Sequence, residues 1–145
     1  MTQTRKKTKT EMLTDAYLHT TYRVLAADET IDIRIGAVNP VLDSLLQARQ
    51  AQTWAFVTAS NPRSRELTSE SNAKRNDAMK NSLREAGWCY LDALGVPDRQ
   101  DWFPEHSVLI PGIGRDEAVA LGRHWEQNAI VFGKTGEPPE LVWIA

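Results

Sequence analysis

The polar residues between positions 61 and 127 include the side chains best suited to chemistry. The set comprises Asn61, Arg63, Ser64, Asn72, Arg75, Asn76, Glu105 and Gln127. Amides and hydroxyls can hydrogen-bond a ligand, and guanidinium groups can neutralise a negative charge. Glu105 is the candidate catalytic residue, because a carboxylate could act as a general base or, with Asp98 and Asp101 in a loop predicted over 95–105, bind Mg²⁺. Trp102 in the same loop is either a stacking lid or a hydrophobic plug. The set therefore predicts a site for an anionic small molecule, nucleotide- or phosphate-like.

Part of this set interrupts the apolar stripe of a helix predicted over residues 69–86. Met79 and Leu83 share one face of that helix. The residues that continue this face toward the N-terminus are polar: Asn72, Arg75 and Asn76. A polar group at a core position needs a partner or costs roughly 1–3 kcal/mol. Two explanations stay open: the side chains bond the neighbouring loop and strand end, or they line a pocket there.

The elements before this helix are expected to place its N-terminus beside the same polar residues. A strand over 54–59, apolar on both faces, ends at the turn signal Asn61-Pro62. Thr68 is the expected N-cap of the helix, and Gly87 is its expected stop. The positive end of the helix dipole and the nearby arginines favour an anion. The alternative is that the arginines are solvated or pair with neighbouring carboxylates.

The remaining elements follow from periodicity and turn signals. Alternation over 18–25 and 30–35 predicts a hairpin, and Asn39-Pro40 begins a short helix. Further strands are expected at 88–91, 107–110, 129–132 and 141–144, and a last helix at 115–127. Gly122 in the apolar stripe of that helix indicates a close approach to the sheet. Residues 1–12 are expected to form a flexible basic tail, and residues 13–145 a single α+β domain.

The order of elements predicts the architecture. From residue 54 to 132 it is strand, helix, strand, strand, helix, strand, as in a ferredoxin-like split βαβ core. The N-terminal β-hairpin plus helix and an extra C-terminal strand are additions to this core. The fold class is therefore α+β, with a three-layer α/β sheet as the alternative.

This topology makes a geometric prediction about the site. It brings the 60–65 loop, the start of the helix 69–86, Glu105 and Gln127 to one end of the sheet. The opposite end receives the 87 and 111–114 turns, which offer little chemistry.

Composition and charge exclude several classes of protein. A net charge of −2 over 145 residues gives no general attraction to nucleic acid or an anionic membrane. No apolar run is long enough to cross a bilayer. The histidines at 19, 106 and 124 lack metal-ligand spacing, and no cofactor is expected. The single Cys89, expected to be packed and inert, precludes an intrachain disulfide and predicts a cytoplasmic location.

Several short motifs occur along the chain: T-x-Y at 20–22, I-R-I-G at 33–36, W-A-F-V-T-A-x-N-P at 54–62 with Ser64, S-N at 71–72, Glu105 with Ser107, and Q-N-A-I-V at 127–131. Together they resemble a bacterial family catalogued as domain of unknown function 3293. Members often have Glu where Ser71 stands, which weakens a capping box here. The resemblance implies that Asn61, Ser64, Asn72, Glu105 and Gln127 are site residues. The family supplies no established activity.

Two alternatives to ligand binding remain open. The first is a hydrolase that acts on a phosphate ester, with Glu105 as base or metal ligand. The second is a protein-interaction module without a small-molecule site, in which exposed strand edges or the five tryptophans form a homodimer or bind a protein partner.

Overall fold

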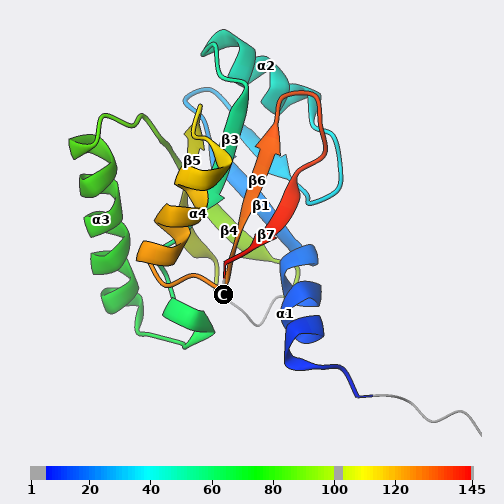
Figure 1. Ribbon diagram of the computed structural model, residues 1–145, viewed down its shortest axis with the longest axis vertical. Helices are drawn as coiled ribbons and strands as arrows, with labels where there is room; N and C mark the ends of the chain where they lie inside the picture. Colours follow the sequence, from blue (N-terminus) through cyan, green and yellow to red (C-terminus); the bar gives the residue numbers. More distant parts are fainter. Residues whose placement is uncertain (1–5, 100–102, 145) are drawn as a thin grey trace, which may run out of the picture.

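The computed structural model describes residues 6–99 and 103–144, which fold as an α+β structure (Figure 1). In this part of the chain, four α-helices accompany a seven-stranded antiparallel sheet that curls into a half-barrel. The elements are α1 (Lys9–Leu18), β1 (Thr20–Leu25), β2 (Thr30–Ile33), α2 (Pro40–Ala48), β3 (Thr53–Val57), the 3₁₀ turn η1 (Pro62–Ser64), α3 (Ser69–Glu85), β4 (Leu91–Pro97), β5 (Glu105–Pro111), α4 (Arg115–His124), β6 (Ala129–Lys134) and β7 (Glu140–Trp143).

The strands lie in the order β2-β1-β4-β5-β3-β6-β7, and every neighbouring pair is antiparallel. The predicted hairpin β1–β2 extends the sheet beyond β4, and β7 extends it beyond β6. The α/β alternative is wrong, because such a sheet would contain parallel pairs.

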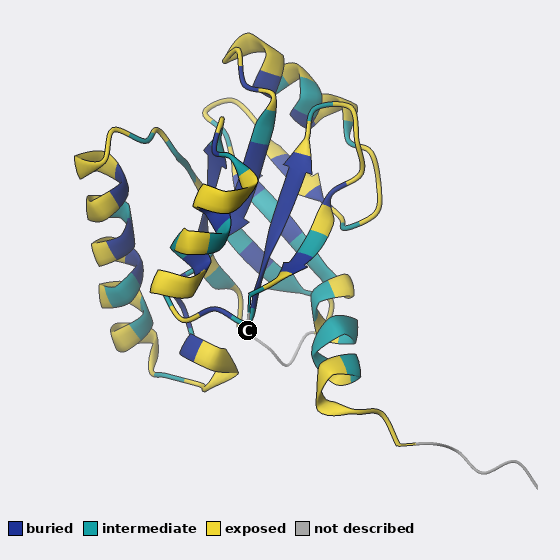
Figure 2. Cartoon of the chain, viewed as in Figure 1, coloured by how far each residue is buried: buried dark blue, intermediate teal, exposed yellow. Residues whose placement is uncertain are grey.

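Each face of the sheet is covered by helices, which explains why β3 is apolar on both sides. Trp54 and Phe56 pack with Leu42 and Leu46 of α2. On the other face the small side chains of β3 pack with α3 and α4, through residues such as Met79. Figure 2 shows the buried sides of these helices turned toward the sheet.

The predicted helix boundaries are confirmed where capping residues define them. The Asn39 side chain accepts a hydrogen bond from the backbone N–H of Leu42 at 3.0 Å. Thr68 does the same for Ser71 at 3.1 Å. After α3, Gly87 has a φ of 86°, the left-handed conformation expected of a helix stop.

Other boundaries are corrected by the structure. Residues 9–12, predicted as tail, form the first turn of α1, whereas residues 1–5 lie outside the described residues. Strand β4 begins at Leu91 rather than 88 and takes in residues 95–97, which were predicted to be loop. Cys89 precedes this strand and is exposed, not packed. The last helix ends at His124.

The curl brings the two edges of the sheet toward each other. After β2, the backbone N–H of Gly36 donates to the carbonyl of Pro139, which precedes β7, at 2.8 Å. Asp43 of α2 accepts a hydrogen bond from the N–H of Gly136 at 3.0 Å. Among the described residues no helix has both the length and the apolarity needed to cross a membrane.

Candidate functional site

The predicted site residues gather at one end of the half-barrel, and Asn61 lies at the centre of their hydrogen bonds. Its backbone N–H donates to the Asn72 side chain at 2.9 Å, and its amide oxygen accepts from Asn72 and from the N–H of Leu67. Its amide nitrogen donates to Glu105 Oε2 at 2.7 Å. Asn61 therefore links α3, the 60–67 loop and the start of β5.

Asn76 hydrogen-bonds the residues that follow β3. Its side chain, in a residue only 3% exposed, accepts from the N–H of Ala59 and donates to the hydroxyl of Ser60, both at 2.9 Å. These groups come just after β3, where the sheet no longer pairs them. Together with the bonds of Asn72, this confirms the first explanation of the polar stripe: it bonds the neighbouring loop and strand end.

Arg75 and Gln127 join that loop to the turn between α4 and β6. Arg75 donates to the carbonyls of Ala59 at 2.6 Å and Trp125 at 2.8 Å, and its guanidinium lies 3.5 Å from Glu126. The buried Gln127 side chain donates to the carbonyls of Ser60 and Trp125. The donors of Arg75 therefore serve two backbone carbonyls and the Glu126 carboxylate, and its role toward a ligand stays a prediction.

The 61–64 loop has an unusual backbone. Asn61, Arg63 and Ser64 all have positive φ values, of 47°, 51° and 61°. Side chains with a Cβ seldom adopt this region, and such strain concentrates at functional sites. The N–H of Arg63 donates to the carbonyl of Glu126 at 2.6 Å, and the hydroxyl of Ser64 accepts from Asn128 at 2.7 Å.

Glu105 lies at the start of a central strand, and its surroundings change its acidity. It begins β5, where it pairs with Gly95, which in turn pairs with Tyr22 of β1. Burial raises the pKa of the Glu105 carboxyl above its ordinary value of 4.5, and the hydrogen bond from Asn61 lowers it by less. A raised pKa makes the ionised carboxylate a stronger base than an ordinary carboxylate.

Of the two aspartates predicted near Glu105, the described one has another partner. Asp98 forms a two-bond ion pair with Arg34 at 2.9 and 3.0 Å. Asp101 and Trp102, predicted as metal ligand and stacking lid, lie outside the described residues. Over the described part of the chain, no group of three or more His, Cys, Asp or Glu could hold a metal ion.

The structure adds Tyr17 of α1 to this end of the molecule. Its ring packs edge-on against Trp143 of β7 with centroids 5.8 Å apart, and its backbone carbonyl accepts from the Tyr22 hydroxyl at 2.8 Å. Burial, with the negative charge of Glu105, raises the pKa of Tyr17 to about 12, against a hydrogen bond with Ser64. No motif in the sequence pointed to this residue.

The half-buried Glu105 carboxylate, the left-handed 61–64 loop and Tyr17 belong to a polar rim at one end of an α+β half-barrel. The family described as "Protein of unknown function (DUF3293)" matches residues 57–130, which span every predicted site residue. The chain belongs to this family. No curated protein and no solved structure matches it.

Proposed function

We propose that this DUF3293 domain binds an anionic small molecule, nucleotide- or phosphate-like, at the rim formed by the 60–65 loop, the start of α3, Glu105 and Gln127. The observation that carries the proposal is the setting of Arg63. This residue is exposed and held in a left-handed conformation. Within the described residues, its guanidinium makes one hydrogen bond, to the Gln127 carbonyl at 2.7 Å. Its remaining donors can face a ligand.

The hydrogen bonds divide the rim residues into two roles. Asn72, Arg75, Asn76 and Gln127 hydrogen-bond loop and turn groups, so they hold the frame. Arg63 and the neighbouring Arg65 supply positive charge, and the Arg65 side chain forms no hydrogen bond or ion pair with another described residue. Asn61, Ser64 and Glu105 provide hydrogen-bonding groups behind these charges.

The test is thermal stabilisation by a panel of nucleotides and phosphometabolites at millimolar concentration. Binding to the folded state raises the melting temperature, and the rise grows with the logarithm of the ligand concentration above the dissociation constant. For the ligand found, Arg65→Gln should weaken binding by about ten- to a hundredfold, because a hydrogen bond to a charged group is worth about 1.5–3 kcal/mol. Arg63→Gln should act in the same direction.

The matched control is Arg49→Gln, which removes the same charge from an exposed residue after α2. Figure 1 shows α2 at the upper end of the molecule, away from α1 and the 62–64 turn at the lower end. Arg49→Gln should leave the affinity unchanged. If no ligand in the panel shifts the melting temperature, or if the Arg49 variant weakens binding as much as the Arg65 variant, the proposal is wrong.

An acid–base reaction at the same rim is a second candidate, favoured by the raised pKa of Glu105. A carboxyl whose pKa moves toward neutrality can take a proton from water or give one to a leaving group. Hydrolysis of a phosphate ester would then depend on Glu105 as base. Release of phosphate from a generic ester by the wild type, absent in Glu105→Gln, would support this function; equal release by both proteins would reject it.

We also propose that the central part of the fold is ferredoxin-like and that the protein is cytoplasmic. The adjacent strands β4-β5-β3-β6, with α3 and α4 packed on one face, support the first. The single cysteine supports the second, because secreted domains commonly rely on disulfides.

A further inference from the structure

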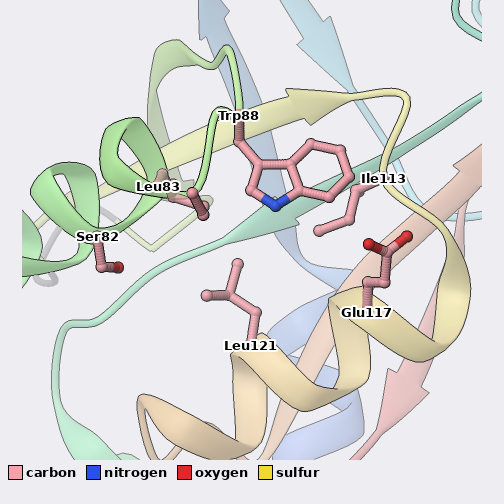
Figure 3. A pocket seen from close by; sticks show the side chains of 7 residues that line it. Ser82, Leu83, Trp88, Ile113, Glu117 and Leu121 are labelled. Carbon is pink, nitrogen blue, oxygen red and sulfur yellow. The ribbon is translucent and has the colours of Figure 1, made fainter.

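A cavity lies at the end of the molecule where the sequence predicted little chemistry. It has a volume of about 200 Å³ and opens between the C-terminal half of α3 and the first turns of α4 (Figure 3). Its lining residues are Ser82, Leu83, Ala86, Trp88, Ile113, Glu117 and Leu121. None of them belongs to the polar rim, so this is a separate place on the molecule.

The size and the walls of the cavity suit one ring of a small molecule. Apolar cavities of about 150 Å³ lined by Leu, Ile and Phe bind benzene in water. Here Ile113 and Leu121 face Trp88 across a common space (Figure 3). The flat face of an indole adds an electron-rich surface, which attracts positive charge as well as aromatic rings.

The charges around the cavity favour a cation. Glu117 lies on its wall, and one of its carboxylate oxygens accepts from the N–H of Gly114 at 3.3 Å. Basic side chains on the flanking helices are already engaged: Lys80 with Asp92, Arg84 with Tyr90 and Asn81, and Arg115 with Glu140. Within the described residues Glu117 therefore has no ion-pair partner, and its negative charge stands beside an apolar wall.

We propose that this cavity binds a small aromatic ammonium compound, with its ring between Trp88 and Leu121 and its ammonium group at Glu117. The ring is removed from water against the apolar walls, and the ammonium stays at the open side, where the carboxylate neutralises it. The ligand is opposite in charge to the one proposed for the rim, so neither proposal depends on the other.

The experiment is an NMR titration of the full-length protein with benzylamine, benzyl alcohol and benzoate, observed at the tryptophan indole N–H signals. These probes share one ring and differ in charge. Benzylamine should bind with a dissociation constant on the order of millimolar, as expected for so small a ligand. Benzyl alcohol should bind about two- to fivefold more weakly and benzoate more weakly still, in line with the strength of an exposed ion pair.

Two variants separate the charge from the cavity. Glu117→Gln keeps an oxygen that can accept from Gly114, and it should remove the preference for benzylamine over benzyl alcohol. Ala86→Leu should fill the space and abolish binding of both probes; Ala86 is the exposed C-cap of α3 with a right-handed backbone, which a leucine can adopt. Asp116→Asn, on the exposed neighbouring position, should change neither. The proposal is overturned if no probe binds, if all bind equally, or if the Asp116 and Glu117 variants behave alike.

Discussion

Glu105 shows how a single side chain is placed at a cost to stability. Its carboxyl lies between Asn61 and the tyrosines of α1 and β1, where burial disfavours the charged form and raises the pKa. Structural carboxylates usually gain a cation or several N–H donors that lower the pKa. Among the described residues, Glu105 instead has one donor, the neutral amide of Asn61. Such a setting favours a role beyond folding, because a neutral amide at this position would satisfy Asn61 equally well.

The first prediction concerns Glu105→Gln and pH. Because the folded pKa is raised, the folded state keeps its proton to a higher pH than the unfolded chain. The free energy of unfolding of the wild type should therefore fall as the pH rises above 4.5, until the folded group has also ionised. Glu105→Gln should lack this fall and be the more stable protein at pH 7.

Urea denaturation between pH 4 and pH 8 measures the effect. The control is Glu66→Gln in the 60–67 loop, where the side chain is exposed. The control should follow the pH dependence of the wild type. A wild type that gains stability from pH 4.5 to pH 7 relative to Glu105→Gln would contradict the prediction.

The polar residues of α3 could be predicted from the sequence because they interrupt the apolar face of the helix. Their hydrogen-bond partners could not be predicted. Asn76 and Arg75 stand where apolar side chains should stand. Their partners are backbone groups that the fold exposes at the end of β3 and after α4, up to 50 residues away in sequence. The sequence pattern shows that a polar residue at a core position needs a hydrogen-bond partner. Only the folded structure shows which group that partner is.

At the scale of elements, α4 depends on a close approach to the sheet that its sequence did predict. A Cβ added to Gly122 would lie 2.8 Å from Cγ2 of Ile130 and 2.2 Å from Cδ1 of Ile144. The end of Ile144 can rotate away. Ile130 is branched at Cβ and lies in β6, so its methyl can move only if the strand or the helix shifts. Gly122 therefore sets the distance between α4 and the sheet.

The second prediction is that Gly122→Ala destabilises the protein by about 1–3 kcal/mol, the usual effect of overpacking. Helix propensity alone would give the opposite sign, by about 1 kcal/mol in favour of alanine. The control Ala120→Gly, at an exposed position of α4, measures that propensity on the same helix. A more stable Gly122→Ala variant in chemical denaturation would show that the helix has room to move.

Helix α1 is an element that the pattern of apolar residues did not predict. Its N-cap is real: Thr8 accepts from the N–H of Glu11 at 3.1 Å, and Thr-x-x-Glu is a sequence signal for such a cap. No residue of α1 is buried, however, so its sequence carries no apolar stripe. Its place is decided by Tyr17 against Trp143, a contact between the two ends of the chain.

At the scale of the whole molecule, the half-barrel is held in its curl by bonds between distant parts. Asp43 in the first turn of α2 accepts from Gly136 in the β6–β7 turn, which joins segments 93 residues apart. The nearby Gly36–Pro139 bond joins the loop after β2 to the residue before β7. Closing so long a loop carries an entropic cost, so these contacts form only when the sheet between them is complete.

The third prediction tests this closure with Asp43→Asn and Asp43→Ala. Both variants remove the same charge from the first turn of α2, but only asparagine keeps an oxygen that can accept from Gly136. The alanine variant should therefore be less stable than the asparagine variant by about 0.5–1.5 kcal/mol, the net contribution of one hydrogen bond. Amide hydrogen exchange at Gly136 and along β7 should be faster in the alanine variant than in the asparagine variant. In β1 and β4 the exchange rates of the two variants should be the same. Equal stability of the two variants would mean that apolar packing alone holds α2 and the β6–β7 turn in position. The curl of the half-barrel would then come from the sheet and not from this hydrogen bond.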